Sequence, residues 1–288
     1  MTPIPPEQAE AVLTRSPSLA PLLARGAVLS PFRRPRPAAA HPRTRLVLPG
    51  LRPDPAKLAA YARVCGFPAA VDTLPVTYPH VLGFPLAMRL MSARDFPLPL
   101  LGLVHTSISV TRHRVTPSAA FHDLTVYVDG LAPHRRGTEA AVVTELRADD
   151  ELVWKSRSTY LARHKTAVAP PKDPARAEDD PELPAVEEWQ LPGDLGRRYG
   201  AASGDRNPIH LHPLTARLFG FPRAIAHGMW TVARCLAAHG TPDAAEVRAD
   251  FRAPVLLPGT VTYAAAGGRF ALLGGRGRVH LTGEVTSL

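Results

Sequence analysis

A repeated order of predicted elements constrains the fold of this 288-residue chain more than any other feature. Residues 81–91 (VLGFPLAMRLM) are apolar nearly all round, which is typical of a buried helix, and from residue 101 onward apolar and polar residues alternate as they do in strands. The second half repeats this order, with a predicted buried helix at 224–239 and three runs of strand character after it. Each half is therefore predicted to fold as an antiparallel sheet wrapped around a helix.

Composition divides the chain into four parts. Residues 1–43 form an arm rich in proline and arginine, and the stretch 31–42 is too dense in proline for regular structure. We expect this arm to pack as a strap on the surface or to be partly disordered. Residues 164–184 are charged and proline-rich, which is typical of a linker. The two predicted units are then 44–163 and 185–288.

Local signals place further elements within these units. Asp54 and Pro55 are a typical N-cap and first turn of a helix, which is predicted to end near Gly66. A second helix is predicted over 194–203, and the segment that follows it is predicted to be a loop. Three strands are expected to close the chain, over 246–257, 260–266 and 276–286.

The sequence shows no membrane or secretion signal. Its longest apolar candidate, 97–104, is far shorter than the roughly 20 residues that a spanning helix needs. Glu7 and Glu10 stand where a signal peptide is basic and then apolar. Cys65 and Cys235 lie far apart and belong to no C-x-x-C pair, so we expect two buried thiols in a reducing compartment. We predict no membrane partner and a cytoplasmic location.

The net charge of +9 does not by itself identify a partner. Residues 1–45 hold seven arginines and two acidic residues, so more than half of the excess positive charge lies in these first 45 residues. No recognised nucleic-acid-binding motif accompanies this charge, so we predict no nucleic-acid partner. A basic surface also suits a small ligand that carries phosphates.

The densest cluster of reactive side chains lies within 199–229. Asp205 and His210 are five positions apart on a segment interrupted by a proline, so a carboxylate and an imidazole can face one substrate atom from two sides. Both groups can exchange protons near neutral pH if burial shifts their pKa values. An Asp-x-Asn-Pro sequence alone is more often a turn. Combination with His227 and Gly228, at the head of the predicted buried helix, favours a catalytic site.

A metal site and a serine nucleophile are the competing interpretations of this cluster. Asp205, His210, His212 and His227 offer oxygen and nitrogen ligands, but the sequence contains no H-E-x-x-H motif. Ser203 lies in A-A-S-G-D rather than in a G-x-S-x-G nucleophile elbow. We therefore predict that the site uses neither a metal nor another cofactor.

The two halves differ at this cluster. Residues 61–67 (YARVCGF) can be laid on 199–205 (YGAASGD), and His80 on His227. Phe67 then stands where the second half has its aspartate, no histidine follows at the spacing of His210, and the second half contains nine extra residues. We predict that the first half lacks the catalytic motif.

The motif segment, Y-x-x-x-S-G-D-x-N-P-I-H followed by G-F and I-x-H-G-M, resembles the signature of the MaoC-like (R)-specific enoyl-CoA hydratases and 3-hydroxyacyl-thioester dehydratases. Residues 251–255 (FRAPV) and 257–259 (LPG) resemble a later strand and turn of that family, with Thr260 where an aspartate is common. The two-half layout resembles the double-hotdog members, in which one half keeps the motif. The resemblance implies an α+β double-hotdog fold.

The resemblance also implies a reaction. It is the reversible hydration of trans-2-enoyl thioesters and dehydration of (3R)-hydroxyacyl thioesters of coenzyme A or acyl-carrier protein, in fatty-acid metabolism. Asp205 and His210 would hold the catalytic water, and either could deliver the proton to C2. The N–H of Gly228, at a helix N-terminus, would stabilise negative charge on the thioester oxygen. The first half would be structural or would bind the acyl chain.

The other motif residues are predicted to bind substrate or to support the loop through side-chain-to-backbone hydrogen bonds. These residues are Ser203, Gly204, Asn207, Pro208 and His227. His212 is predicted to be a bystander, since the family often has an aspartate there.

The alternative function is a non-catalytic acyl-thioester-binding protein or the partner subunit of a heteromeric dehydratase. A double hotdog can complete its sheet within one chain, and pairing of two chains into a homodimer is compatible with it.

Overall fold

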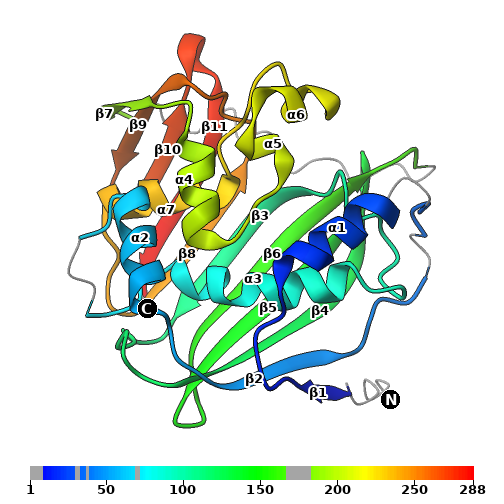
Figure 1. The fold of residues 1–288 in the computed structure, drawn as a ribbon. Helices are drawn as coiled ribbons and strands as arrows, with labels where there is room; N and C mark the ends of the chain where they lie inside the picture. Colours follow the sequence, from blue (N-terminus) through cyan, green and yellow to red (C-terminus); the bar gives the residue numbers. More distant parts are fainter. Residues whose placement is uncertain (1–8, 30–32, 37–38, 69–71, 167–182) are drawn as a thin grey trace, which may run out of the picture.

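The computed structural model describes residues 9–29, 33–36, 39–68, 72–166 and 183–288, and its strands form one strongly curved sheet around a set of helices (Figure 1). The strands are β1 (Glu10–Val12), β2 (Arg45–Leu51), β3 (Val104–Arg112), β4 (His122–His134), β5 (Gly137–Ala148), β6 (Glu151–Arg163), β7 (Ala185–Leu191), β8 (Ala245–Phe251), β9 (Gly259–Ala266), β10 (Arg269–Leu273) and β11 (Val279–Ser287). The helices are α1 (Leu19–Leu29), α2 (Pro55–Cys65), α3 (Tyr78–Met91), α4 (Leu195–Ser203), α5 (Pro208–Leu211), α6 (Pro213–Leu218) and α7 (Gly228–His239).

The strand order repeats between the halves. The sheet runs β1-β2-β4-β5-β6-β3-β8-β11-β10-β9-β7, so β2-β4-β5-β6-β3 in the first half corresponds to β7-β9-β10-β11-β8 in the second. The halves join where β3 and β8 pair in antiparallel fashion, with Ile108 opposite Ala249. Helix α3 packs on β4 and β5, and α7 on β10 and β11. This architecture confirms the predicted α+β double hotdog, and we propose on the same ground that 44–163 and 185–288 are its two units.

The predicted helices occur where local signals place them, with two starting points corrected, and α3 begins at Tyr78 rather than at 81. The Asp54 carboxylate accepts the Ala56 N–H at 2.9 Å, and α2 ends at Gly66 as predicted. Helix α7, however, begins at Gly228 rather than at 224. Residues 224–227 are extended instead, because Ala226 N–H donates to Val255 O at 2.8 Å and pairs this segment with the chain before β9.

Some elements of the structure differ from the sequence prediction. The sequence prediction missed strand β10. This strand is a run of only five residues between two glycine pairs, which is too short to show the alternation of apolar and polar residues that marks a strand. Strand β7 carries mostly exposed polar residues because it is an edge strand, and it buries only Trp189 and Leu191. The N-terminal arm contains β1 and α1, whereas the described part of 31–42 has neither helix nor strand. Most of the predicted linker, 167–182, lies outside the described residues.

Side chains from each half bind the backbone of the other. Trp230 on α7 donates its indole N–H to Val64 O of α2 at 2.9 Å. Arg112, buried at the end of β3, donates to the carbonyls of Thr241 and Asp243 beyond α7. Cys65 and Cys235 are both buried and free, as predicted. No helix within the described residues is long and apolar enough to cross a membrane.

Candidate active site

The structure brings Asp205, His210 and His227 together between the end of α4 and the start of α7. A carboxylate oxygen of Asp205 and one ring nitrogen of each histidine lie within 4.8 Å of one another. The two imidazole rings stack with their centroids 3.7 Å apart, and Asp205 Oδ2 lies 3.9 Å from His227 Nε2. His212 is not part of this cluster, because it is exposed and its Nδ1 accepts the Leu214 N–H at the start of α6.

A chain of short-range hydrogen bonds shapes the turn that carries Asp205. Helix α4 ends at Gly204, whose φ of 81° lies in the left-handed region that favours glycine. The Ser203 hydroxyl donates to Tyr199 O at 2.9 Å and accepts the Asp205 N–H at 3.2 Å. Asp205 Oδ1 in turn accepts the Asn207 N–H at 3.1 Å, which fixes the carboxylate on its own backbone.

His210 lies on the short helix α5 rather than on the predicted loop. The Asn207 side chain caps this helix and Pro208 occupies its first position. The His210 Nδ1–H donates to Ile225 O at 2.8 Å. A carbonyl can only accept, so the Nε2 atom of the neutral ring carries the lone pair. His210 is only 9% exposed.

Burial shifts the pKa values of this pair in opposite directions. Desolvation raises the pKa of Asp205, while the nearby His210 charge and the Asn207 N–H partly oppose this effect. Desolvation lowers the pKa of His210, opposed by the Asp205 charge and the bond to Ile225 O. Both shifts favour a neutral acid and a neutral imidazole.

His227 ties the turn of Asp205 to the head of α7. Its Nε2–H donates to the backbone carbonyl of Asp205 at 2.9 Å. Its Nδ1 is buried and has no hydrogen-bond partner among the described residues. Burial, with the charge of His210, holds the pKa of His227 well below its ordinary value. The ring therefore stays neutral and acts as a fixed hydrogen-bond donor to the turn.

Two glycines of α4 permit the close approach of the motif segment that carries Asp205 and His210, and sequence reasoning missed both. A Cβ on Gly196 would lie 1.9 Å from the backbone O of His210, and one on Gly200 would lie 2.8 Å from the backbone O of Asp205. The two glycines are four residues apart, so they lie on one face of the helix. Their spacing, G-x-x-x-G within 196–200, was the signal that could have revealed this packing.

The head of α7 offers a backbone N–H for which the described residues supply no acceptor. Gly228 is the first residue of the helix, so its N–H has no acceptor within the helix. The ring of Phe251 covers this residue so closely that a Cβ on Gly228 would lie 2.9 Å from Phe251 Cε1. Only glycine leaves this space unfilled beside the helix N-terminus.

The first half also reaches the site. Its His105 ring lies 4.7 Å from the Phe251 ring and 4.6 Å from the Tyr160 ring, measured between centroids. Burial chiefly raises the pKa of Tyr160, and the Asp205 charge contributes to the shift. Sequence reasoning missed these residues, because pairing of β3 with β6 and β8 is what brings His105 beside Tyr160 and Phe251.

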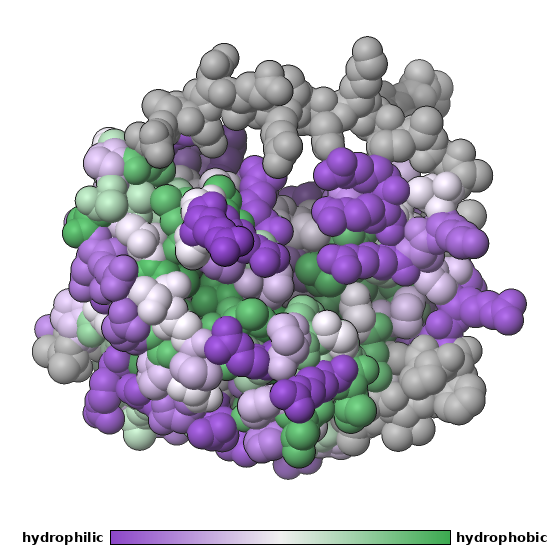
Figure 2. All heavy atoms as spheres, turned by 90° about the horizontal axis from the view of Figure 1, so that it is seen from above, coloured by the Kyte–Doolittle hydropathy of each residue, from purple (hydrophilic) through white to green (hydrophobic). Residues whose placement is uncertain are grey.

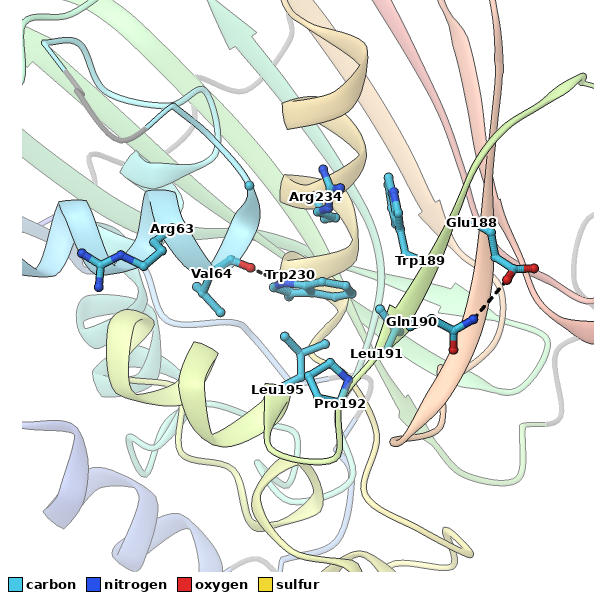
Figure 3. A pocket seen from close by; sticks show the side chains of 11 residues that line it. Arg63, Val64, Glu188, Trp189, Gln190, Leu191, Pro192, Leu195, Trp230 and Arg234 are labelled. Carbon is cyan, nitrogen blue, oxygen red and sulfur yellow. Dashed lines mark hydrogen bonds between the residues drawn. The ribbon is translucent and has the colours of Figure 1, made fainter.

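A separate pocket of about 310 Å³ lies between α2, α7 and β7 (Figure 3). The guanidinium of Arg234 stacks 4.1 Å from the centre of Trp189, and its Nη2 lies 3.8 Å from Glu187. The pocket contains none of the clustered catalytic candidates. Its stacked side chains join α7 to the edge strand, and we do not include it in the active site.

Lowering the pH from 7 to about 4 is expected to destabilise the fold. Burial lowers the pKa of seven histidines, and for His80 the value falls from 6.5 to about 4. Because these folded-state values lie below the unfolded value, the stability contribution is present above pH 6.5 and is lost as the pH falls. For His80 alone the loss is about 3 kcal/mol. The seven residues are His80, His105, His122, His210, His227, His239 and His280.

Thermal unfolding followed by circular dichroism across this pH range measures the effect. His80→Gln is the control, since it removes one titrating group and should flatten the pH dependence. A wild-type melting temperature that stays constant between pH 7 and 4 would contradict this prediction.

Comparisons with known proteins agree with the geometry. Residues 180–275 match the model of the MaoC-like domain family. Over 243 residues the chain is 37% identical to 3-hydroxyacyl-thioester dehydratase X of Mycobacterium tuberculosis, covering 82% of this chain and 86% of that protein. The crystal structure of HtdX from the same organism matches with a TM-score of 0.74 and 34% identity, over 85% of this chain and 100% of that one.

A more distant structure supports the fold alone. A MaoC-like dehydratase of Phytophthora capsici matches with a TM-score of 0.69 and 20% identity, over 85% of this chain and 95% of that chain. The identity to the mycobacterial dehydratase extends through most of both chains, beyond the motif segment. This chain belongs to the MaoC-like dehydratase family.

Proposed function

We propose that this protein is a hydro-lyase that dehydrates (3R)-hydroxyacyl thioesters and, in reverse, hydrates trans-2-enoyl thioesters. One observation carries the proposal: a carboxylate with a raised pKa and an imidazole with a lowered pKa meet beside the free N-terminus of α7. The similarity to a protein named 3-hydroxyacyl-thioester dehydratase supports the same reaction.

In the hydration direction the shifted pKa values favour the states that the reaction needs. His210 Nε2 takes a proton from water as the water oxygen bonds to C3, and neutral Asp205 gives its proton to C2. Negative charge that develops on the thioester oxygen is stabilised by the Gly228 N–H and the helix dipole. Dehydration follows the reverse path and begins with ionised Asp205 and protonated His210. Ser203, Gly204, Asn207, Pro208 and His227 hold these groups in place.

Purified protein with 3-hydroxybutyryl-CoA or a longer (3R)-hydroxyacyl-CoA tests the proposal. We expect the absorbance of the enoyl thioester to appear with the (3R) form and not with the (3S) form. Binding of acyl thioester without turnover of either form would instead favour a non-catalytic or partner subunit.

Removal of metal ions is expected to leave the activity unchanged. Asp205, His210 and His227 have the spacing of a metal site, but an ion there would occupy the lone pairs that the proposed proton transfers require. Dialysis against a chelator, with elemental analysis before and after, measures this. Loss of activity that returns with a divalent ion would replace the metal-free mechanism with a metal-dependent one.

Two broader assignments rest on the same ground. We propose a role in fatty-acid metabolism and a cytoplasmic location, which two free buried thiols support. Separation of labelled protein among cell fractions tests the location.

A further inference from the structure

An exposed apolar surface lies directly after the catalytic histidine. Leu214 and Leu218 on α6 are 62% and 83% exposed, and Phe219, the next residue, is 40% exposed. The two leucines are four residues apart and therefore share one side of the helix. Contiguous exposed apolar side chains of this kind mark interaction sites more often than isolated ones do. We name Leu214, Leu218 and Phe219 the α6 surface.

The segment that carries the α6 surface is rich in arginine. The segment 195–229 contains five arginines, all exposed, and its single acidic residue is the catalytic Asp205. None of these arginines forms an ion pair with another described residue. The five are Arg197, Arg198, Arg206, Arg217 and Arg223.

Three of these arginines are held in place by hydrogen bonds to backbone carbonyls. Arg197 donates to Leu211 O at 3.2 Å, Arg217 to Pro222 O at 3.3 Å, and Arg223 to Pro258 O at 3.0 Å. Each guanidinium keeps further N–H groups for an incoming carboxylate or phosphate. The surface thus combines fixed positive charge with exposed apolar area. Helix α6 lies at the upper side of the molecule in Figure 1, and Figure 2, seen from above, shows hydrophobic and hydrophilic residues interleaved on this face.

We propose that the α6 surface docks an acidic acyl-carrier protein that delivers the thioester, an inference that rests on the proposed function. The phosphates of coenzyme A need only the arginines, whereas three exposed apolar side chains are complementary to an apolar protein surface. The location also fits, since His210 on α5 is separated from α6 by two residues. The five exposed arginines of this segment select an acidic partner and steer its approach.

The test compares one 3-hydroxyacyl group carried by acyl-carrier protein and by coenzyme A. Leu218→Glu places a like charge against the acidic partner, and we expect kcat/KM for the carrier-protein thioester to fall by about tenfold or more, mainly through KM, which corresponds to about 1.4 kcal/mol. The value for the coenzyme A thioester should be unchanged. Val186→Glu is the matched control, at an apolar side chain on β7 that is 61% exposed, and it should affect neither substrate.

A second measurement addresses the charge. The wild-type kcat/KM for the carrier-protein thioester should fall as salt is raised, and Arg217→Glu with Arg223→Glu should weaken this dependence. Circular dichroism shows whether each variant is folded.

Several outcomes would overturn the docking role. One is an equal fall in kcat/KM for both thioesters in the Leu218→Glu variant, and another is no fall in kcat/KM for either. A third is dissociation of a homodimer by Leu218→Glu with unchanged kinetics, which would make the α6 surface a contact between two copies of this chain. Wild-type turnover of the coenzyme A thioester leaves the proposed function standing in each case. Absence of turnover with both thioesters removes the proposed function and the docking role with it.

Discussion

His210→Ala is expected to lower kcat for dehydration by roughly two to four orders of magnitude, the range that a positioned acid or base contributes. The variant removes the Nε2 lone pair. Among the described histidines, cysteines and acidic residues, only Asp205 and His227 share this cluster with His210. His227 cannot replace it, because its Nε2–H is bound to Asp205 O and its Nδ1 is buried. Asp205→Asn should cause a loss of similar size, since an amide cannot deliver the proton.

The fold should survive these changes, and KM should change little. Steady-state kinetics with a (3R)-hydroxyacyl-CoA, beside the melting temperature of each variant, separates a chemical effect from a structural one. His212→Asp is the matched control, because this histidine lies two residues away, is exposed, and caps α6 with an acceptor that aspartate also provides. A His210→Ala enzyme with near wild-type kcat would exclude His210 from the chemistry.

Gly196→Ala is expected to cost both stability and activity, although alanine is ordinarily a better helix former than glycine. The new Cβ would lie 1.9 Å from the His210 carbonyl oxygen, and this neighbour is backbone that cannot rotate away. Relief requires α5 to move from α4, with a cost of about 1–3 kcal/mol. Displacement of His210 by about an ångström should lower kcat by about 10²-fold.

Chemical unfolding and steady-state kinetics measure the two effects together. Gly130→Ala is the control, since a Cβ at this position on β4 would meet nothing within 4 Å and its φ is not positive. It should leave both quantities unchanged. A Gly196→Ala protein that is more stable than wild type and fully active would show that α4 does not set the position of His210.

Sequence patterns predicted the elements whose signals are local. Examples are the cap at Asp54, the buried helix α3 and the alternating strands β4 to β6. The signal for each comes from residues that lie close together in the sequence. Strand β10 was missed and the start of α7 was predicted wrongly. Both depend on hydrogen-bond partners that lie elsewhere in the sequence. Ala226, for example, is extended because Val255 accepts its N–H.

The candidate site shows the same division. The motif over 199–229 specified which side chains could carry the chemistry, and Phe67 opposite Asp205 in the other half indicated which half lacks it. The roles of these site residues remain proposals. The distances, the tautomer of His210 and the contact of His105 with Phe251 came only from the folded chain.

The sequence by itself indicated the family, because the motif over 199–229 carries its residue types at fixed local spacing, and that resemblance implied the double-hotdog architecture and the acid and base candidates. The tertiary structure decided the direction of the pKa shifts and the environment of the site. Burial depends on every element packed around Asp205 and His210, and the first half contributes to these surroundings, since the Asp205 charge also acts on Tyr160 of β6. Desolvation is a property of that whole packing arrangement, so no local spacing of residues could have given it.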